Sequence, residues 1–336
     1  MKRFFHRYLA GAMLAITALF GGAAHAADTP DTKAQTVTLL FAGDIVLDGK
    51  PGKLIEQGQD PFADFAGILA DADIRVGNLE CVVATSGDQA DKTYTFRAHP
   101  RTLDVLKRHF DAVSIANNHS GDYGRAAFGE MLGLLKQKGI PYFGGGKDLH
   151  EAHTPVIITR KGIRIALLAY DEFLPRSFEA GTDAAGVAWS EDEQVVDDIK
   201  KARNIHHADI VIPFMHWGWE NEMTANGRQR RLARLMIDAG ADAVIGAHPH
   251  VIQDTDTYKG KPILYSIGNF MIDELDNEAQ TQVSVLKLDI SRSGVTAWQT
   301  RVGKIDANGI PHPAADTGSP CWKQGQQLPG LCGMPK

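Results

Sequence analysis

Apolar runs alternate with amphipathic segments along the first two-thirds of the chain. Continuous apolar runs at 36–42, 112–116 and 210–214 are typical of buried strands. Between such runs, apolar residues recur at helical spacing, as they do over 62–69 and 127–135. This order of strands and helices predicts parallel strands that are joined by right-handed helical crossovers.

The last third of the chain has a different pattern. Apolar and polar residues alternate over 282–290 and 295–302, and a Ser293-Gly294 pair separates the two segments. Earlier in the chain, the runs 155–159 and 163–169 are likewise joined by a short turn, Lys161-Gly162. Both pairs predict antiparallel hairpins. The chain as a whole is therefore expected to adopt an α/β fold with mixed sheets.

Two local signals predict where helices begin and end. Ser190 with Glu193 forms a capping-box pattern ahead of an apolar helical face, so a helix is expected to begin there. Gly139 follows the helical pattern of 127–135 and is the expected stop signal of that helix.

The N-terminus has the pattern of a cleaved signal peptide. A positively charged start is followed by a short apolar stretch and by Ala24-His25-Ala26, which suits a signal peptidase. We therefore expect a signal peptide at 1–26, a linker at 27–35, one domain at 36–305 and an irregular tail at 306–336. The protein is expected to be periplasmic or secreted.

Three cysteines are present. In an oxidising compartment, Cys321 and Cys332 are expected to form a disulfide across the Gly/Pro-rich tail. Cys81 follows an expected strand and is expected to be a buried free thiol rather than a nucleophile.

Composition narrows the class of protein. A hydrophobic share of 43% and a charged share of 23% are ordinary for a globular enzyme. The formal net charge is −6, which argues against nonspecific binding of nucleic acid. A polyanionic ligand would therefore need a local positive site, such as a metal.

The segment Gly246-Ala247-His248-Pro249-His250 carries the strongest chemical signal. It follows an apolar run at 243–245, so its two imidazoles lie just past a strand. Neutral imidazole is a common metal ligand. Several other apolar runs also end in residues that suit a metal; these are Asp44, Asn78 with Glu80, Asn117-Asn118-His119, and His216.

Carboxyl ends of strands in an open α/β sheet meet at one edge, where ligands bind. Carboxylate, amide oxygen and imidazole together suit one or two divalent cations, such as Mn, Zn, Fe or Mg. His119 is the candidate catalytic residue, because it can protonate a leaving group there. The expected metal ligands are Asp44, Glu80, Asn118, His216, His248 and His250. Residues expected around them are Asn78, Asn117, Trp217, Glu220 and Asn269.

These residues, in this order, resemble the calcineurin-like metallophosphoesterases, and more closely the CapA-type capsule-synthesis proteins of poly-γ-glutamate biosynthesis. The resemblance covers about residues 36 to 302. It is carried by Gly43-Asp44, 77–80, 116–119 with 122–124, 216–220, 246–251 with Gln253, and 266–270.

The resemblance implies a metallophosphoesterase-like β-sandwich of mixed sheets flanked by helices. It also implies that Asp44, Asn118, His216 and the pair His248 and His250 bind metal, and that His119 donates a proton.

The chain departs from the superfamily at two positions. Val46 stands where a second ligand, a histidine, is usual, and Asn78 replaces the usual bridging aspartate unless Glu80 takes that role. One metal position is thus poor in ligands, which leaves open whether two metals bind and whether catalysis is retained.

Three functions remain open at this stage. The first is the synthesis, export or anchoring of poly-γ-glutamate or a similar anionic envelope polymer, with membrane-bound synthase subunits as partners. The second is a metal-dependent hydrolase of phosphoester or amide bonds in envelope polymers. The third is a noncatalytic polymer-binding module. Nucleic acid is not an expected partner of any of them.

Overall fold

The computed structural model describes residues 36–315 and 318–332. The predicted signal peptide (1–26) and the predicted linker (27–35) both lie outside these residues. Among the helices of the described part, none combines the length and apolar character that a membrane crossing requires.

The larger of two main sheets is mixed and has ten strands. Its middle strands β1, β2, β5 and β6 run parallel, whereas β16 pairs antiparallel with β1 and with β17. The order across the sheet is β20 (Gly330–Cys332), β19 (Ser319–Lys323), β17 (Gly294–Ile305), β16 (Gln282–Ser291), β15 (Asn269–Met271), β1 (Val37–Ile45), β2 (Ile74–Leu79), β5 (Ala112–Ser114) and β6 (Tyr142–Phe143), with β18 (Pro311–Pro313) paired to β17.

The second main sheet has six strands. Four parallel strands form its centre, and an antiparallel hairpin closes each edge. The order is β13 (Thr255–Tyr258), β14 (Lys261–Leu264), β12 (Val244–Ala247), β11 (Ile210–His216), β9 (Ile163–Asp171) and β8 (Val156–Arg160). Two small ladders pair β3 (Val82–Val83) with β4 (Arg97–Ala98) and β7 (Gly145–Gly146) with β10 (Gly186–Val187).

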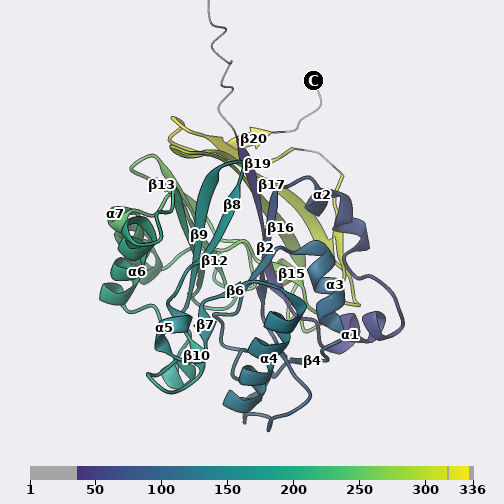
Figure 1. Ribbon diagram of the computed structural model, residues 1–336. Helices are drawn as coiled ribbons and strands as arrows, with labels where there is room; N and C mark the ends of the chain where they lie inside the picture. The colour runs from purple at the N-terminus through teal and green to yellow at the C-terminus, as the bar shows by residue number, and fades with distance from the viewer. Residues whose placement is uncertain (1–35, 316–317, 333–336) are drawn as a thin grey trace, which may run out of the picture. The chain divides into compact units, whose positions relative to one another are not determined.

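The two main sheets pack face to face, and helices cover their outer faces (Figure 1). Phe41 of β1 and Phe214 of β11 meet between the sheets, with ring centroids 5.4 Å apart. The ten-stranded sheet is covered by α1 (Gly49–Glu56), α2 (Ala66–Ala70), α3 (Thr102–His109) and α4 (Gly124–Lys138). The six-stranded sheet is covered by α5 (Leu149–Ala152), α6 (Asp192–Asn204) and α7 (Gly227–Ala239). Three 3₁₀ turns are η1 (Ala63–Phe65), η2 (Arg176–Phe178) and η3 (Ala279–Thr281).

The expected α/β fold, a sandwich of mixed sheets flanked by helices, is confirmed. The apolar run at β1 is continuous because this strand is covered by helices on one face and by the other sheet on the opposite face, so both sets of side chains are buried. The predicted helix stop is also confirmed, since Gly139 caps α4 with a φ of 63°.

The prediction of an irregular tail after residue 305 is wrong. Described residues beyond 305 form β18, β19 and β20, which extend the ten-stranded sheet. Trp322 in β19 is fully buried in the core between the sheets, and this burial stabilises the pairing of β19 with β17. Its high Gly and Pro content conceals the alternation that marks a strand. The predicted Cys321–Cys332 disulfide is confirmed, with a Cα–Cα separation of 5.8 Å, and Cys81 is a buried free thiol.

The prediction that Ser190 and Glu193 form a capping box at the start of α6 is also wrong. Ser190 does not cap the helix; its hydroxyl donates to Glu172, 2.7 Å away, and Glu191 takes the cap position without a side-chain hydrogen bond. The capping box occurs instead at α7, where Asn226 and Gln229 bond to each other's backbone. The Ser190 hydroxyl bonds to Glu172, which is distant in sequence, instead of to the backbone at the start of the helix.

Candidate metal centre

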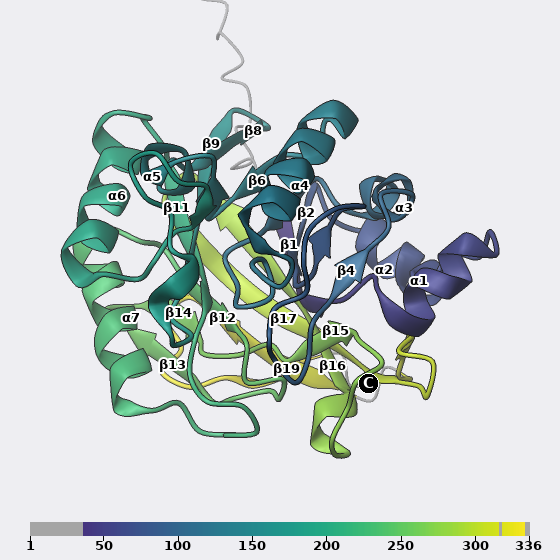
Figure 2. The same ribbon diagram turned by 90° about the horizontal axis from the view of Figure 1, so that it is seen from below.

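The polar residues that follow the apolar runs meet at one edge of the sandwich. Asp44 lies near the end of β1, and Glu80 directly follows β2. His216 is the last residue of β11, while His248 and His250 lie in the loop after β12. Figure 2 looks onto this end of the strands. The centre therefore draws side chains from both main sheets.

Asp44 is fully buried and held from three sides. The Asn78 amide Nδ2 donates to its Oδ1 at 2.7 Å, the backbone N–H of His248 donates to Oδ2 at 3.3 Å, and His250 Nδ1 lies 3.4 Å from Oδ2. Burial raises the pKa of this carboxyl, but the hydrogen bond and charge of His250 outweigh burial and leave the pKa lowered. Asp44 is thus a carboxylate, as a metal ligand must be.

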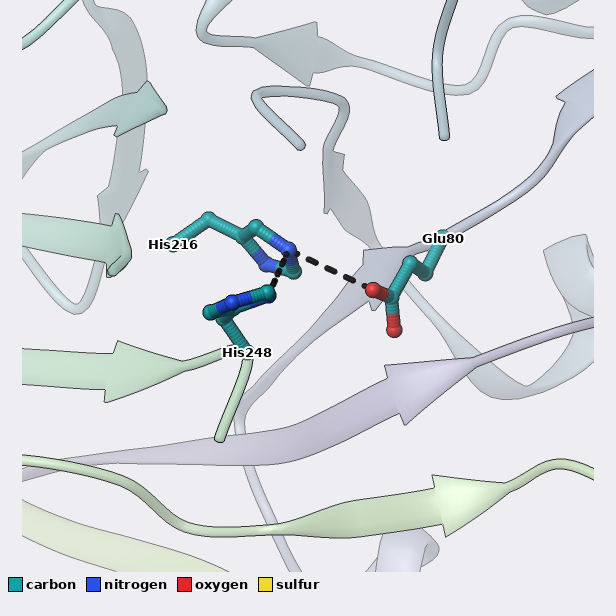
Figure 3. Close-up of side chains that lie close together, drawn as sticks. All are labelled: Glu80, His216 and His248. Atoms are coloured by element: carbon teal, nitrogen blue, oxygen red, sulfur yellow. Dashed lines mark hydrogen bonds and ion pairs between the residues drawn. The ribbon is translucent and has the colours of Figure 1, made fainter. Parts of the chain in front are cut away.

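His216 directs Nε2 toward a cluster of acceptor atoms. Asn118 Oδ1 lies 2.7 Å from Nε2. His248 Nδ1 lies 3.1 Å from the same atom and Glu80 Oε1 lies 3.3 Å from it (Figure 3). Asn78 Nδ2 lies 3.1 Å from the opposite nitrogen, Nδ1. Burial lowers the pKa of His216 to about 3, so the ring is neutral near pH 7. One N–H cannot satisfy three acceptors, whereas a cation can bind several of them.

Three polar atoms at this point lack hydrogen-bond partners. Both carboxylate oxygens of Glu80 and Nε2 of His248 are buried and unpaired within the described part of the chain. Each unmet group of this kind costs roughly 1–3 kcal/mol. Burial, followed by the charge of Asp44, raises the pKa of Glu80 well above its ordinary value. The raised pKa favours the protonated acid while no cation is bound. Once its proton leaves, the Glu80 carboxylate and the neutral His248 imidazole form the donor set of a divalent metal, so the residues fit one.

Candidate ligand atoms form overlapping groups. Glu80, His216 and His248 offer atoms within 4.8 Å of one another, and so do Asp44, Glu80 and His250. Because Glu80 belongs to both groups, it is placed to be shared by two neighbouring cations. A third group joins the exposed Glu220 to His248 and His250.

The loop after β12 has a strained backbone at both histidines. The φ angle is 94° at His248 and 58° at His250, in the left-handed region that side chains disfavour. Such residues cost roughly 1–3 kcal/mol each and cluster at functional sites. Burial lowers the pKa of His248 well below its ordinary value, whereas the charges of Glu80 and Asp44 overcome burial and raise the pKa of His250 to about 10.

His119 belongs to a separate hydrogen-bonded chain beside these ligands. Its Nδ1 lies 2.6 Å from Asp122 Oδ2, and Asp122 also accepts from Lys92 at 2.5 Å and from the Phe96 backbone at 2.8 Å. Burial lowers the pKa of His119 in spite of Asp122. With Nδ1 bound to Asp122, Nε2 is the nitrogen left to exchange a proton.

The other residues predicted around the ligands either hydrogen-bond to the candidate ligands or lie buried behind them. Asn78 turns its amide nitrogen toward Asp44 and His216, and its oxygen accepts from Asn117 at 3.1 Å. The Asn117 oxygen accepts from the His119 backbone and the Ser120 hydroxyl, so neither asparagine presents a spare oxygen. Asn269 Oδ1 lies 2.8 Å from Nδ1 of His250 and orients that ring. Trp217 is fully buried and donates to the Tyr265 carbonyl.

Glu220, expected among the residues around the ligands, is exposed and offers an oxygen within 4.8 Å of ligand atoms of His248 and His250. Val46, at the position of the usual second histidine, is fully buried and offers no ligand.

Two residues that contact the site, Lys92 and Phe173, are not predicted from the sequence. Lys92 holds both the Asn118 carbonyl and Asp122, and the ring of Phe173 packs against that of His248 at 4.8 Å. Both lie on loops without periodicity, so no pattern of the sequence marks them.

The chain matches the model of a family described as bacterial capsule synthesis protein PGA_cap over residues 38–274. It is 34% identical over 257 residues to the PGA biosynthesis protein CapA of Bacillus subtilis (strain 168), covering 74% of this chain and 67% of that protein. Identity to the capsule biosynthesis protein CapA of Bacillus anthracis is 30% over 249 residues, covering 71% of this chain and 61% of that protein.

A probable polyglutamine synthesis accessory protein of Mycobacterium tuberculosis is 32% identical over 230 residues, covering 63% of this chain and 60% of that protein. The chain thus spans about two-thirds or less of the length of these relatives. Among solved structures, a hypothetical protein from Thermus thermophilus shares the fold, with a TM-score of 0.53 and 15% identity over 80% of this chain and 99% of the other.

Proposed function

Because the chain belongs to the PGA_cap family of bacterial capsule synthesis proteins, we propose that it acts in the synthesis, export or anchoring of an anionic γ-glutamyl polymer or a similar envelope polymer. We further propose that it does so as a metal-dependent hydrolase of phosphoester or amide bonds, with the centre around Glu80 as its active site. Membrane-bound synthase subunits are the proposed partners. The proposed location is periplasmic or secreted, which is based on the signal-peptide pattern of 1–26.

One observation supports the metal most directly. Glu80 and His248 keep three unpaired polar atoms at a point that further ligand candidates surround. In a fold whose described buried side chains are otherwise paired, such a set is expensive unless a ligand satisfies it. Asp44, Glu80, His216, His248 and His250 would hold the cation, with Asn118 Oδ1 beside them.

When bound, a divalent cation would polarise a phosphoryl or carbonyl group and lower the pKa of a water molecule. The chain's own residues supply the rest. Asn78 and Asn117 fix the carboxylate of Asp44 and the ring of His216. Asp122 and Lys92 fix the His119 ring, whose Nε2 can hold or deliver the proton of a leaving group.

A cleft that begins at Leu47, three residues after Asp44, supports an anionic polymer as the partner. Its volume is about 460 Å³. Three basic side chains line it, Lys53, Arg97 and Arg101, against the carboxylates of Asp48 and Glu56. Glu56 pairs with Arg101, whereas Arg97 and Lys53 form no ion pair within the described residues. The Arg97 guanidinium is held by the Ser86 and Gly87 carbonyls at 3.3 Å and lies 4.2 Å over the ring of Tyr123. A preoriented arginine without a carboxylate partner is suited to bind a carboxylate of the polymer.

The metal is tested by titrating the purified, chelator-treated protein with Mn²⁺ and Zn²⁺ in a calorimeter. Wild type is expected to bind, and Glu80→Gln, which keeps the shape but removes the charge, is expected to lose about 100-fold or more in affinity. His109→Gln is the matched control, because His109 is also buried but pairs with Asp60 outside the centre. Absence of binding in wild type, or equal loss in both variants, would contradict the proposal.

A noncatalytic polymer-binding role is the second candidate, favoured by Val46 and Asn78, which leave one metal position without its usual ligands. Polymer production in cells separates the two. If His119→Ala protein accumulates normally and supports full production, catalysis by this centre is not required; loss of production would support catalysis.

A further inference from the structure

Two neighbouring tryptophans have opposite environments. Trp217 is fully buried and its Nε1 donates to the Tyr265 carbonyl at 2.8 Å. Trp219, two residues later, is 63% exposed. An indole left this open costs the protein a large part of the apolar burial that a tryptophan can provide, and aromatic side chains in such positions are typical of binding sites.

Trp219 also lies at the rim of the metal centre. His216 precedes it by three residues and Glu220 follows it, and both belong to candidate ligand groups. Trp219 lines a cavity of about 500 Å³ together with Leu174, which is 65% exposed. Phe173 lines the same cavity and contacts the ring of His248 at 4.8 Å. The cavity and the metal centre therefore share a wall.

The charged groups of this cavity are ion-paired, and carboxylates outnumber arginines among them. Arg228 donates to Glu172 at 2.7 Å, to Asp192 at 2.5 Å and to the Ser190 carbonyl at 3.0 Å. The carboxylate of Glu191 pairs with Arg176 at 2.7 Å. No lining cation in the described residues is thus left for an anion, in contrast to the cleft of Arg97 and Lys53. A γ-glutamyl carboxylate would lose its hydration here without a compensating charge.

The remaining surface offers aromatic and aliphatic faces beside hydrogen-bonding groups. Trp219 and Leu174 supply the apolar faces, while Ser190 and the carboxylate oxygens of Glu172 and Glu191 supply acceptors at the walls. A pyranose ring has the same division, with C–H groups on its faces and hydroxyl donors at its edge. The volume is in the range of small-molecule sites and can hold one or two rings.

From this we propose that the cavity bounded by Trp219 and Leu174 is a subsite for an uncharged saccharide unit, with Trp219 as the stacking platform. The saccharide would be the part of the envelope polymer, or the acceptor, that is presented to the metal centre. This role rests on the proposed function, whereas saccharide binding itself does not, because it needs neither metal nor turnover.

The test is calorimetric titration of the chelator-treated full chain with the tetramer of N-acetylglucosamine and with a glucose tetramer. We expect at least one of them to bind wild type, Trp219→Ala to weaken that binding about tenfold or more, and Trp219→Phe to retain most of it. Leu331→Ala is the control; Leu331 is 66% exposed and lies in β20, outside the cavity. It should bind like wild type.

Three results would overturn the proposal. These are failure of both oligosaccharides to bind, equal binding by Trp219→Ala and wild type, and a preference of the cavity for another chemistry. The last is measured by repeating the titration with a γ-glutamyl tetramer and with neutral phosphatidylcholine vesicles; tighter binding of either that depends on Trp219 would assign the cavity to that ligand. Because no metal is present, these outcomes are independent of the metal test above.

Discussion

At the scale of single residues, protons and cations compete for the same atoms of the centre. In the absence of a cation, burial keeps the pKa of Glu80 high, and the charges of Glu80 and Asp44 keep the pKa of His250 at about 10. A metal can bind these groups only after their protons leave.

Metal binding is therefore expected to release protons and to strengthen as the pH rises. Affinity should increase by up to about tenfold per pH unit for each proton released. Calorimetry at a mildly acidic and a mildly alkaline pH, in two buffers of different ionisation enthalpy, measures the number released. A buffer-independent enthalpy together with a pH-independent affinity would contradict this picture.

Asp171 gives a second, separate prediction at this scale. It is buried at the end of β9, and burial raises its pKa from 3.8 to about 7. The folded protein thus binds this proton more tightly than the unfolded chain does. The resulting stabilisation is complete below about pH 4, declines as the pH rises, and is lost above about pH 7.

Asp171→Asn should remove this contribution, which is about a few kcal/mol at most. The free energy of unfolding, measured with urea at about pH 5 and about pH 8, should fall less between these values in the variant than in wild type. An identical difference in both proteins would show that Asp171 does not hold the extra proton.

Single residues were predictable where a motif fixed their chemistry. The pair His248 and His250 was found from its spacing, and the structure brings it together with Asp44, Glu80 and His216. The amide orientation of Asn78 and the role of Lys92 could not be found, because both depend on partners distant in sequence. Their roles follow from three-dimensional packing rather than from local pattern.

At the scale of elements, the centre depends on close approach between backbones. A Cβ at Gly246 in β12 would lie 2.0 Å from the Tyr265 carbonyl oxygen and 2.4 Å from Nε1 of Trp217. By contrast, a Cβ at Gly133 in α4 would meet nothing within 4 Å. Substitution by alanine is therefore expected to change the stability of the protein in opposite directions at these two glycines.

Gly246→Ala is expected to destabilise the protein by about 1–3 kcal/mol and to weaken metal binding, because the end of β12 must shift. Gly133→Ala is expected to stabilise it by about 0.5–1 kcal/mol and to leave metal binding unchanged. Urea unfolding and the metal titration check both. If Gly246→Ala were as stable as wild type, the close approach at β12 would be wrong.

Elements with continuous apolar runs, such as β1 and β11, were predicted close to their observed bounds. The short helix α1 and the strands β18 to β20 were not, because their sequences are rich in Gly, Pro or charge and lack a clear period. These elements are stabilised by what they pack against, as Trp322 illustrates, and single-sequence patterns do not contain that information.

At the scale of the whole molecule, net charge and local charge differ in sign. The chain carries a formal charge of −6, yet the cleft at Lys53 and Arg97 is lined by three basic side chains, Lys53, Arg97 and Arg101, against two acidic ones, Asp48 and Glu56. A polyanion is repelled by most of the surface and is attracted at the cleft.

Binding of a γ-glutamyl oligomer is therefore expected to weaken with added salt and to fall about tenfold in Arg97→Ala with Lys53→Ala. The matched control is Lys201→Ala, because Lys201 is a surface lysine of α6 paired with Asp197. Fluorescence polarisation of a labelled oligomer at several salt concentrations measures both. Equal loss in the control would mean that overall charge, and not this cleft, governs binding.

The disulfide is also a property of the whole molecule, since it fixes the last strands of the ten-stranded sheet. Its removal in a Cys321→Ser, Cys332→Ser variant should lower the free energy of unfolding by about 2–3 kcal/mol, because the unfolded chain regains the entropy of an open loop. Reductant should lower wild type to the same level and should not affect the variant. Denaturant titration of the four samples provides the measurement.

The division of the candidate metal ligands between the two sheets has a consequence for how the site forms. Asp44 and Glu80 come from one sheet, and His216, His248 and His250 from the other. A chain in which only one layer has formed therefore presents two carboxylates or three imidazoles, but not the mixed set that grips a cation firmly. The complete candidate metal site would therefore appear in a single step, when the two layers dock, and a half-folded chain would lack it.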